Sequence, residues 1–325
     1  MGQRFYAIAM NTFVETLRQP IFGVILMLTA AMLILNVSLA AFTLDDDNKL
    51  LLDLGLSTLL LSGLFLAAFS ATGVLSREID NKTVLSVISK PVTRPLFIFG
   101  KFTGLIAALG LAYYLSALVF ILAQRHGVLQ NSSDPWDAPV LTLGFGSVAL
   151  ASFVAAFCNY LYGKHFSTTA IAVQTPLLTL GVLVVCFFDK QWEPIPFASN
   201  FVGGQVLLAV FLVFLVVVIM ASVALAASTR FGQMMTLIIC VVFLLVGLIA
   251  DYCLGQYAES SKIAALLYGL IPNVGPFWII DGLYAESAQT AVPLVYVGYA
   301  TGYATLLTIA IVSIAIIAFQ RREVG

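Results

Sequence analysis

Long stretches without a single acidic or basic residue are the feature that most restricts what this chain can fold into. They include residues 21–44, 54–76, 102–124, 138–163, 194–229, 231–250 and 287–320. An α-helix needs about 20 apolar residues to cross the hydrocarbon core of a bilayer. Lipid offers no hydrogen-bond partner to the backbone, so only helices and closed barrels can cross. The runs are continuous, without the alternation of barrel strands, so we predict an all-α integral membrane protein, a polytopic helical bundle.

The composition also indicates that the chain is surrounded by lipid. Hydrophobic residues make up 61% of the 325 residues and charged residues only 10%, whereas soluble domains carry about 25% charged residues. A soluble protein of this composition would expose large apolar patches and aggregate. The two histidines and four cysteines form no ligand pair or CxxC motif, so we expect no metal site and no disulfide framework. We also expect no nucleic-acid partner.

Eight spans are predicted, at 20–42, 52–75, 97–123, 139–162, 168–188, 204–228, 233–252 and 293–319. Six spans are the alternative, if 139–188 lies differently. The segment 263–280 is apolar but interrupted by Pro272, Gly275 and Pro276. We therefore interpret 263–290 as an outer re-entrant segment that does not cross the membrane.

The distribution of basic residues predicts the orientation of these spans. With eight crossings, one side receives eleven of the fifteen: Arg4, Arg18, Arg77, Lys82, Lys90, Arg94, Lys101, Lys164, Arg230, Arg321 and Arg322. The other side receives four: Lys49, Arg125, Lys190 and Lys262. Because basic residues are retained in the cytoplasm, the first side is predicted to be cytoplasmic and to hold both termini.

Residues 1–19 show helical amphipathicity. Phe5, Tyr6, Ala9, Met10, Phe13, Val14 and Leu17 share one half of a helical wheel. The other half carries Arg4, Asn11, Glu15, Arg18 and Gln19. This pattern predicts an amphipathic helix in the membrane interface that leads into the first span at Pro20.

The longest charged cytoplasmic connection, 76–101, reads "SREIDNKTVLSVISKPVTRPLFIFGK". A short amphipathic helix is predicted here, with Val84, Leu85, Val87 and Ile88 on its apolar face. The other face carries Lys82, Ser86, Ser89 and Lys90, and Pro91 ends the helix. Glu78 and Lys82 stand at the i,i+4 spacing of a helical ion pair. The alternative is a solvated loop whose positive charges only enforce topology.

This segment resembles the cytoplasmic segment of type-2 ABC transporter permeases. Glu78, Thr83, Pro91, Val92, Thr93, Arg94 and Lys101 match the pattern, while Lys82 stands where the family usually has Gly. "LIPNVGPFWIIDGLY", followed by a last span and "FQRREVG", and "STRFGQ" at 228–233, are also similar to the family. Residues 139–188 have no counterpart in the six-span pattern, which suggests an inserted helical pair.

The resemblance implies a permease that forms a homo- or heterodimer with a second permease copy and binds two separate cytoplasmic ABC ATPase subunits. The apolar face would dock in an ATPase groove, and Glu78, Lys82 and Arg94 would make charged contacts at its rim. The implied ATPase-coupling set is Glu78, Lys82, Thr83, Val84, Leu85, Val87, Ile88, Pro91 and Arg94. ATP and Mg²⁺ would be bound by the partner, and this chain itself would hold no cofactor.

The source of energy is also constrained by what the sequence lacks. "YGKHF" at 162–166 has neither the upstream Gly nor the Ser or Thr of a phosphate-binding loop. Ion-coupled carriers place charged residues inside the bilayer, and the uncharged stretches above contain none. Asp251 and Asp281 fall near the outer boundary, as interfacial anchors or as a substrate gate.

We therefore expect a non-enzymatic permease subunit of an ATP-driven exporter in the plasma membrane, most simply a bacterial inner membrane. Its cargo would be an apolar, lipid-like or drug-like compound, or an ion. A non-transporting membrane scaffold or assembly factor and a gradient-driven carrier remain the alternatives.

Overall fold

The protein is all-α over the part of the chain that the structure describes. The computed structural model describes residues 2–41, 47–80, 93–129, 134–197, 203–258, 265, 268, 271–280 and 292–320, with the backbone alone for 76–80. No strand occurs in these ranges, where the only β-type pairing is one isolated bridge between Phe188 and Pro194. The predicted fold class is confirmed.

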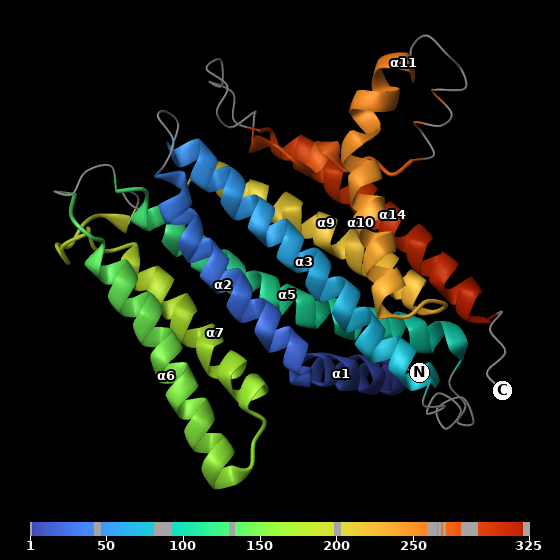
Figure 1. Ribbon diagram of the computed structural model, residues 1–325, viewed down its shortest axis with the longest axis horizontal. Helices are drawn as coiled ribbons and strands as arrows, with labels where there is room; N and C mark the ends of the chain where they lie inside the picture. Colours follow the sequence, from blue (N-terminus) through green and yellow to red (C-terminus); the bar gives the residue numbers. More distant parts are fainter. Residues whose placement is uncertain are drawn as a thin grey trace. The chain divides into compact units, whose positions relative to one another are not determined.

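Eight helices among the described residues are long and apolar enough to span a membrane (Figure 1). They are α2 (Pro20–Ala40), α3 (Asp47–Asp80), α5 (Arg94–His126), α6 (Ala138–Tyr162), α7 (Phe166–Val185), α9 (Gly204–Ser228), α10 (Gln233–Ala250) and α14 (Leu294–Gln320). Each corresponds to one predicted span. The eight-span prediction is therefore confirmed over the six-span alternative, and the protein is a multi-pass membrane protein.

Four shorter elements complete the described helices. The first is α1 (Gly2–Arg18), which corresponds to the predicted N-terminal helix. A π-helical turn, η1 (Asp251–Gly255), extends α10 and is followed by α11 (Gln256–Ala258). A 3-10 turn, η2 (Gly275–Phe277), lies in the predicted outer segment. Most of 263–290 lies outside the described residues.

The ends of α6 show how local sequence sets a helix boundary. Asp137 precedes the first turn, and its carboxylate accepts a hydrogen bond from the backbone N–H of Val140 at 3.1 Å. This N-cap satisfies a donor that has no partner within the helix. At the other end Gly163 adopts a left-handed conformation (φ 62°) and stops the helix. A three-residue turn then leads into α7, so that α6 and α7 form a helical hairpin.

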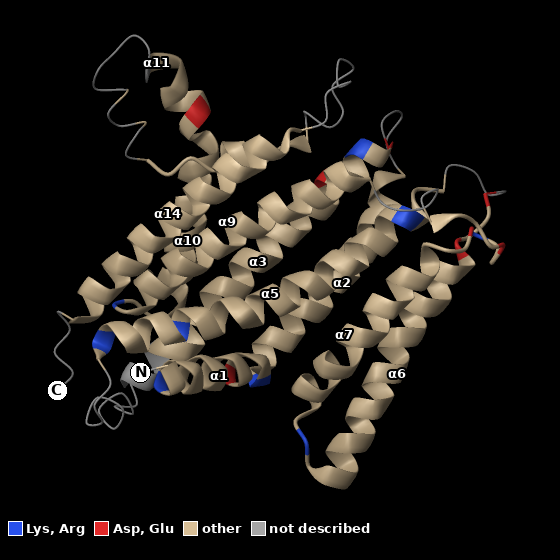
Figure 2. Ribbon diagram, turned by 180° about the vertical axis from the view of Figure 1, so that it is seen from behind, with Lys and Arg blue, Asp and Glu red and all other residues tan. Residues whose placement is uncertain are grey.

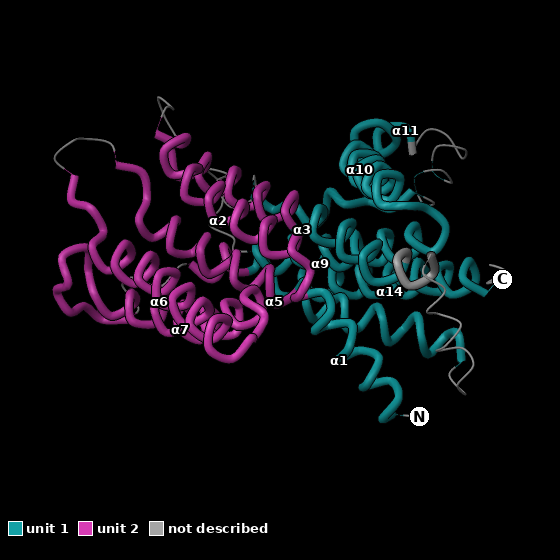
Figure 3. Tube along the Cα trace, turned by 60° about the horizontal axis from the view of Figure 1, so that its bottom comes forward, with its two compact units in different colours: residues 1–16, 63–109, 208–325 teal, residues 17–62, 110–207 magenta. Residues whose placement is uncertain are grey.

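The chain divides into two compact units (Figure 3). Unit 1 contains residues 1–16, 63–109 and 208–325, and unit 2 contains residues 17–62 and 110–207. The hydrophobic interior is supplied mainly by α3, α5 and α9, because 56%, 61% and 61% of their most apolar windows are buried. In the other five spanning helices the buried share is 22–28%, so most of their apolar side chains are left for lipid.

Charged residues gather at helix ends and in connections, and the middles of the spanning helices carry none (Figure 2). Polar amides inside the spans bond to neighbouring helices. The Asn36 amide donates to the Thr58 hydroxyl at 2.9 Å, which joins α2 to α3. The Gln174 amide donates to the Ser147 hydroxyl at 3.1 Å, which joins α7 to α6. Such bonds satisfy polar groups that lipid cannot.

Candidate functional site

The predicted ATPase-coupling residues fall largely outside the described structure. Glu78 lies in the last turn of α3, where only the backbone is described. Lys82, Thr83, Val84, Leu85, Val87, Ile88 and Pro91 lie outside the described residues. Arg94 is the first residue of α5. The structure therefore describes the two helices on either side of residues 81–92, which we call the predicted coupling segment, and the packing around their ends in unit 1.

We call this region the inner end of unit 1. It comprises α1, the first turns of α5, the turn between α9 and α10, and the last turn of α14. Every one of these pieces was predicted to lie on the cytoplasmic side. Contacts described next join α1 and the last turn of α14 to α5, and the turn between α9 and α10 to α14. This agrees with the order of crossings predicted from the charges.

Helix α1 packs closely against the start of α5 at two glycines. A Cβ atom at Gly100 would lie 2.8 Å from Cγ2 of Ile8. A Cβ atom at Gly104 would lie 2.7 Å from Cβ of Thr12 and would overlap the carbonyl oxygen of Ala9. Glycines four residues apart allow two backbones to approach in this way. From the first contact to the second, the position advances by four residues on α5 (Gly100 to Gly104) and by four on α1 (Ile8 to Thr12). The two helices therefore run side by side in the same direction.

An ion pair joins the same two helices. Lys101 Nζ lies 3.6 Å from a carboxylate oxygen of Glu15. The Lys101 side chain is 3% exposed and the Glu15 side chain is 37% exposed, so the lysine is enclosed and part of its partner reaches water, although the paired oxygen of Glu15 is buried. Lys101 Nζ also lies 5.7 Å from the centroid of the Phe97 ring, within the range of a cation–π contact. A buried ammonium requires such partners, so Lys101 fixes α5 to α1.

Two arginines hold the last turn of α14. Arg94 donates from Nη1 to the carbonyl oxygen of Gln320 at 2.6 Å. Arg230, in the turn between α9 and α10, donates from Nη2 to the carbonyl oxygen of Ala318 at 3.0 Å. The last carbonyls of a helix lack partners within it and carry partial negative charge, so cations are favourable there. We refer to these two bonds as the inner clamp.

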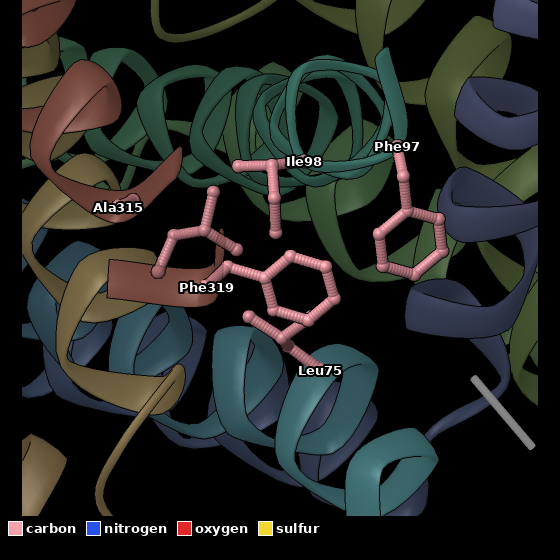
Figure 4. Packing of buried hydrophobic residues seen from close by; sticks show 6 residues of the cluster. Leu75, Phe97, Ile98, Ala315 and Phe319 are labelled. Carbon is pink, nitrogen blue, oxygen red and sulfur yellow. The ribbon is translucent and has the colours of Figure 1, made fainter. Parts of the chain in front are cut away.

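An apolar cluster lies beneath the inner clamp (Figure 4). It joins four helices through Leu75 of α3, Phe97 and Ile98 of α5, Leu225 of α9, and Ala315 and Phe319 of α14. The rings of Phe97 and Phe319 are stacked with their centroids 5.7 Å apart. Each member is at most 3% exposed. The helices that carry the coupling segment are thus packed onto α14 immediately next to that segment.

The face that α1 buries differs from the predicted apolar face. Thr12 and Thr16 are fully buried, whereas Tyr6 is 68% and Met10 is 44% exposed. The buried stripe is rotated because the glycines of α5 accept small side chains. Tyr6 and Met10 remain available for lipid, as expected of an interfacial helix, whereas Phe5 of the same face stacks on Phe99 of α5 with ring centroids 5.6 Å apart.

The opposite end of unit 1 contains a second polar network. The Asp251 carboxylate accepts hydrogen bonds from the Tyr268 hydroxyl at 2.5 Å and the Asn273 amide at 2.6 Å. The backbone N–H of Asn273 donates to the Tyr303 hydroxyl of α14 at 2.9 Å. The hydrogen bond to Asp251 is the main reason that the pKa of Tyr268 is raised. We call Asp251, Asn273 and the segment 271–280 the outer network.

Unit 2 has its own buried ion pair, which we call the outer latch. Nε of Arg125, at the end of α5, lies 3.3 Å from an oxygen of Asp137, whose side chain is fully buried. Nη2 of Arg125 also donates to the carbonyl oxygen of Phe188 at 2.9 Å, beyond the end of α7. The outer latch therefore fixes the α6–α7 hairpin to α5.

Sequence reasoning missed several of these residues. Gly100 and Gly104 have the i,i+4 spacing of a close helix contact, which could have been recognised. Lys101 matched the family pattern, but nothing in the sequence indicated Glu15 as its partner. The contact of Arg94 with an ATPase stays a prediction, and the sequence did not indicate that its guanidinium donates to the carbonyl oxygen of Gln320 in α14. In the described residues no group of His, Cys, Asp and Glu could hold a metal ion.

Comparison with models of protein families and with curated proteins finds no match to this chain. The site is therefore described by its geometry. In this multi-pass membrane protein, the helices on either side of a charged connection are fixed to the peripheral helix α1 and to the last span, α14.

Proposed function

We propose that this chain is the membrane permease subunit of an ATP-driven exporter of the ABC type, located in the plasma membrane. It works as a dimer with separate ATPase subunits, which bind ATP and Mg²⁺. Its cargo is an apolar, lipid-like or drug-like compound. The proposal begins from the resemblance of residues 74–104 to such permeases.

The observation that supports it most is the packing around the coupling segment. An ATPase that pulls on residues 81–92 can move the spans only if the flanking helices are firmly attached to the bundle. Leu75 and Phe97 lie on either side of that segment in the chain, and both are buried in the same apolar cluster. Lys101 fixes the returning helix to α1 as well. A loop that only enforced topology would not need these attachments.

The distribution of charge disfavours a gradient-driven carrier. The middles of the eight spanning helices carry no Asp, Glu, Lys or Arg. Carriers driven by protons or sodium ions use such groups to bind the coupling ion. Energy supplied from a cytoplasmic partner fits this composition better.

A binding experiment tests the proposal. The tagged chain is purified in mild detergent, and we expect an ABC ATPase, encoded beside it, to copurify. The variant Val84→Asp/Ile88→Asp, on the predicted docking face, should lose that ATPase and its stimulation. The matched control Ser86→Asp/Ser89→Asp adds the same charge to the other face and should retain both.

Two results would contradict the proposal. One is equal stimulation of the ATPase by both double variants, which would remove the docking role. The other is transport by the reconstituted chain alone when a proton or sodium gradient is applied, which would identify a carrier. A chain that copurifies with other membrane proteins and with no ATPase would be a scaffold.

A further inference from the structure

Helix α14 is held by hydrogen bonds to other elements at both of its ends. At the inner end, the inner clamp fixes the carbonyls of Ala318 and Gln320. At the outer end, the Tyr296 hydroxyl donates to the carbonyl of Pro276 at 2.5 Å, and two turns farther along the helix the Tyr303 hydroxyl accepts from the backbone N–H of Asn273. The rings of Phe277 and Tyr303 also pack with their centroids 6.2 Å apart.

Between its ends α14 has a smoother contact surface. Its buried positions form a single stripe, most of it small: Val297, Ala300, Ala304, Thr308, Val312, Ala315 and Phe319. The hydroxyls of Thr301, Thr305 and Ser313 bond to carbonyls of α14 itself. Only 28% of its most apolar window is buried. The hydroxyls in this stretch bond within α14, and the hydrogen bonds described above that join α14 to other elements lie nearer its two ends.

The outer end of α14 leads directly to the outer network. Asn273 bonds both to Tyr303 and to the Asp251 carboxylate of η1. The backbone N–H of Val274 donates to the carbonyl of Gly247 in α10 at 3.0 Å. Gly275 has no room for a side chain, because an added Cβ would lie 2.5 Å from a carboxylate oxygen of Asp251. A shift of α14 along its axis therefore has to move or break this network.

We propose that α14 acts as a strut, that is, a rigid helix that transmits a movement at its inner end to the outer segment 271–280. Arg94 and Arg230 are the positioning residues, since they fix its inner end next to the predicted coupling segment. A continuous helix of 27 residues spans about 40 Å, the depth of a bilayer with its headgroups. Arg94 begins α5, immediately after the coupling segment, so movement of that segment acts directly on the end of α14. The use of the strut in transport rests on the proposed function. The mechanical link is a property of the isolated chain.

The test uses the isolated chain in lipid nanodiscs, without ATPase or ATP. Cys253 is an exposed native cysteine in η1, beside Asp251, and reports on the outer network. Its labelling rate with a hydrophilic maleimide is measured by peptide mass spectrometry, together with hydrogen exchange of 271–280. We expect Arg94→Met/Arg230→Met to change both rates by about threefold or more, a typical size for coupling between remote sites.

Two matched variants distinguish coupling between the two ends of α14 from a general destabilisation of the protein. Arg18→Met removes an exposed arginine from the end of α1 and should leave both rates unchanged. Arg94→Lys/Arg230→Lys retains cationic donors and should restore rates close to those of the parent chain. Unchanged rates at Cys253 and 271–280 in the Met variant, with faster exchange confined to 315–320, would overturn the proposal.

The reverse direction provides a second test if the double Met variant does not fold. Tyr303→Phe removes the acceptor for Asn273 but keeps the aromatic ring. Coupling between sites is reciprocal, so this variant should speed hydrogen exchange at 315–320, and unchanged exchange there would contradict the strut. Neither test involves an ATPase. If the two ends of α14 prove to be coupled but no ATPase binds the chain, only the proposed function is refuted. If an ATPase binds and is stimulated but the two ends of α14 are not coupled, only the strut is refuted.

Discussion

The two ends of α5 are attached to neighbouring helices by ion pairs that differ in how deeply the acidic side chain is buried. At its start, Lys101 pairs with Glu15 of α1 at 3.6 Å; the Glu15 side chain is 37% exposed, although the oxygen that faces Lys101 is itself buried. At its end, Arg125 pairs with Asp137 of α6 at 3.3 Å, and the carboxylate is fully buried. Asp137 also caps α6, and Arg125 also binds the carbonyl of Phe188.

This difference shows how one helix can be fixed at one end and adjustable at the other. A fully enclosed pair is expensive to break, because the remaining charge has no solvent. A pair with one partly exposed partner is expected to contribute less than a pair whose carboxylate is fully buried. At the start of α5 the attachment therefore depends more on the glycine contact with α1 than on charge. An adjustable attachment is suitable for the end that borders the coupling segment.

Breaking the outer latch should have the largest effect. Asp137→Ala leaves Arg125 enclosed without its carboxylate and removes the cap of α6. We expect the free energy of unfolding to fall by about 3–5 kcal/mol, measured by chemical unfolding in bicelles. Arg125→Met/Asp137→Leu removes both charges and should recover much of the loss. A double variant no more stable than the single one would contradict this account.

A side chain at Gly104 should have an intermediate effect. Gly104→Val meets the backbone of Ala9, which cannot move aside as a flexible side chain can. Overpacking of this kind costs about 1–3 kcal/mol. The control is Gly146→Val in α6, where a Cβ atom would meet nothing within 4 Å. Thermal unfolding in detergent should separate the two variants, and equal melting temperatures would rule out a close contact between α1 and α5.

The Lys101–Glu15 pair should have the smallest effect. A double-mutant cycle with Lys101→Met and Glu15→Gln should give a coupling energy below about 1 kcal/mol, as for pairs with an exposed partner. The same cycle at Arg125 and Asp137 should give a larger value. If the Lys101 cycle gave the larger energy, the distinction between a fixed and an adjustable end of α5 would be wrong.

The spanning helices could be predicted from the sequence because crossing a bilayer is a local requirement on length and polarity. Each of the eight predicted spans has its helix, and α3 alone extends well beyond both predicted ends. Helix ends that the basic residues assigned to the same side of the membrane also contact one another within each unit. Arg94 and Arg230 meet the end of α14, and Arg125 meets the end of α7.

The contacts of the site could not be predicted in the same way, because they depend on which surfaces meet. The periodicity of α1 shows an apolar face but does not reveal whether lipid or protein covers it, so Thr12 and Thr16 were not expected to be buried. Arg94 was predicted to make a charged contact with an ATPase, and nothing in the sequence indicated an acceptor within the chain. Its actual acceptor, the carbonyl of Gln320, is 226 residues away in the chain.

The outer latch also has a consequence for the order of assembly during synthesis. Arg125 is made first, and Asp137 follows after one short connection. The carbonyl of Phe188 is added only after both helices of the hairpin have been translated. The latch therefore closes in two steps, the ion pair before the backbone bond, and the second step requires α6 and α7 to have entered the membrane. A chain that ends before Phe188 can therefore form the ion pair of the outer latch but not its backbone bond.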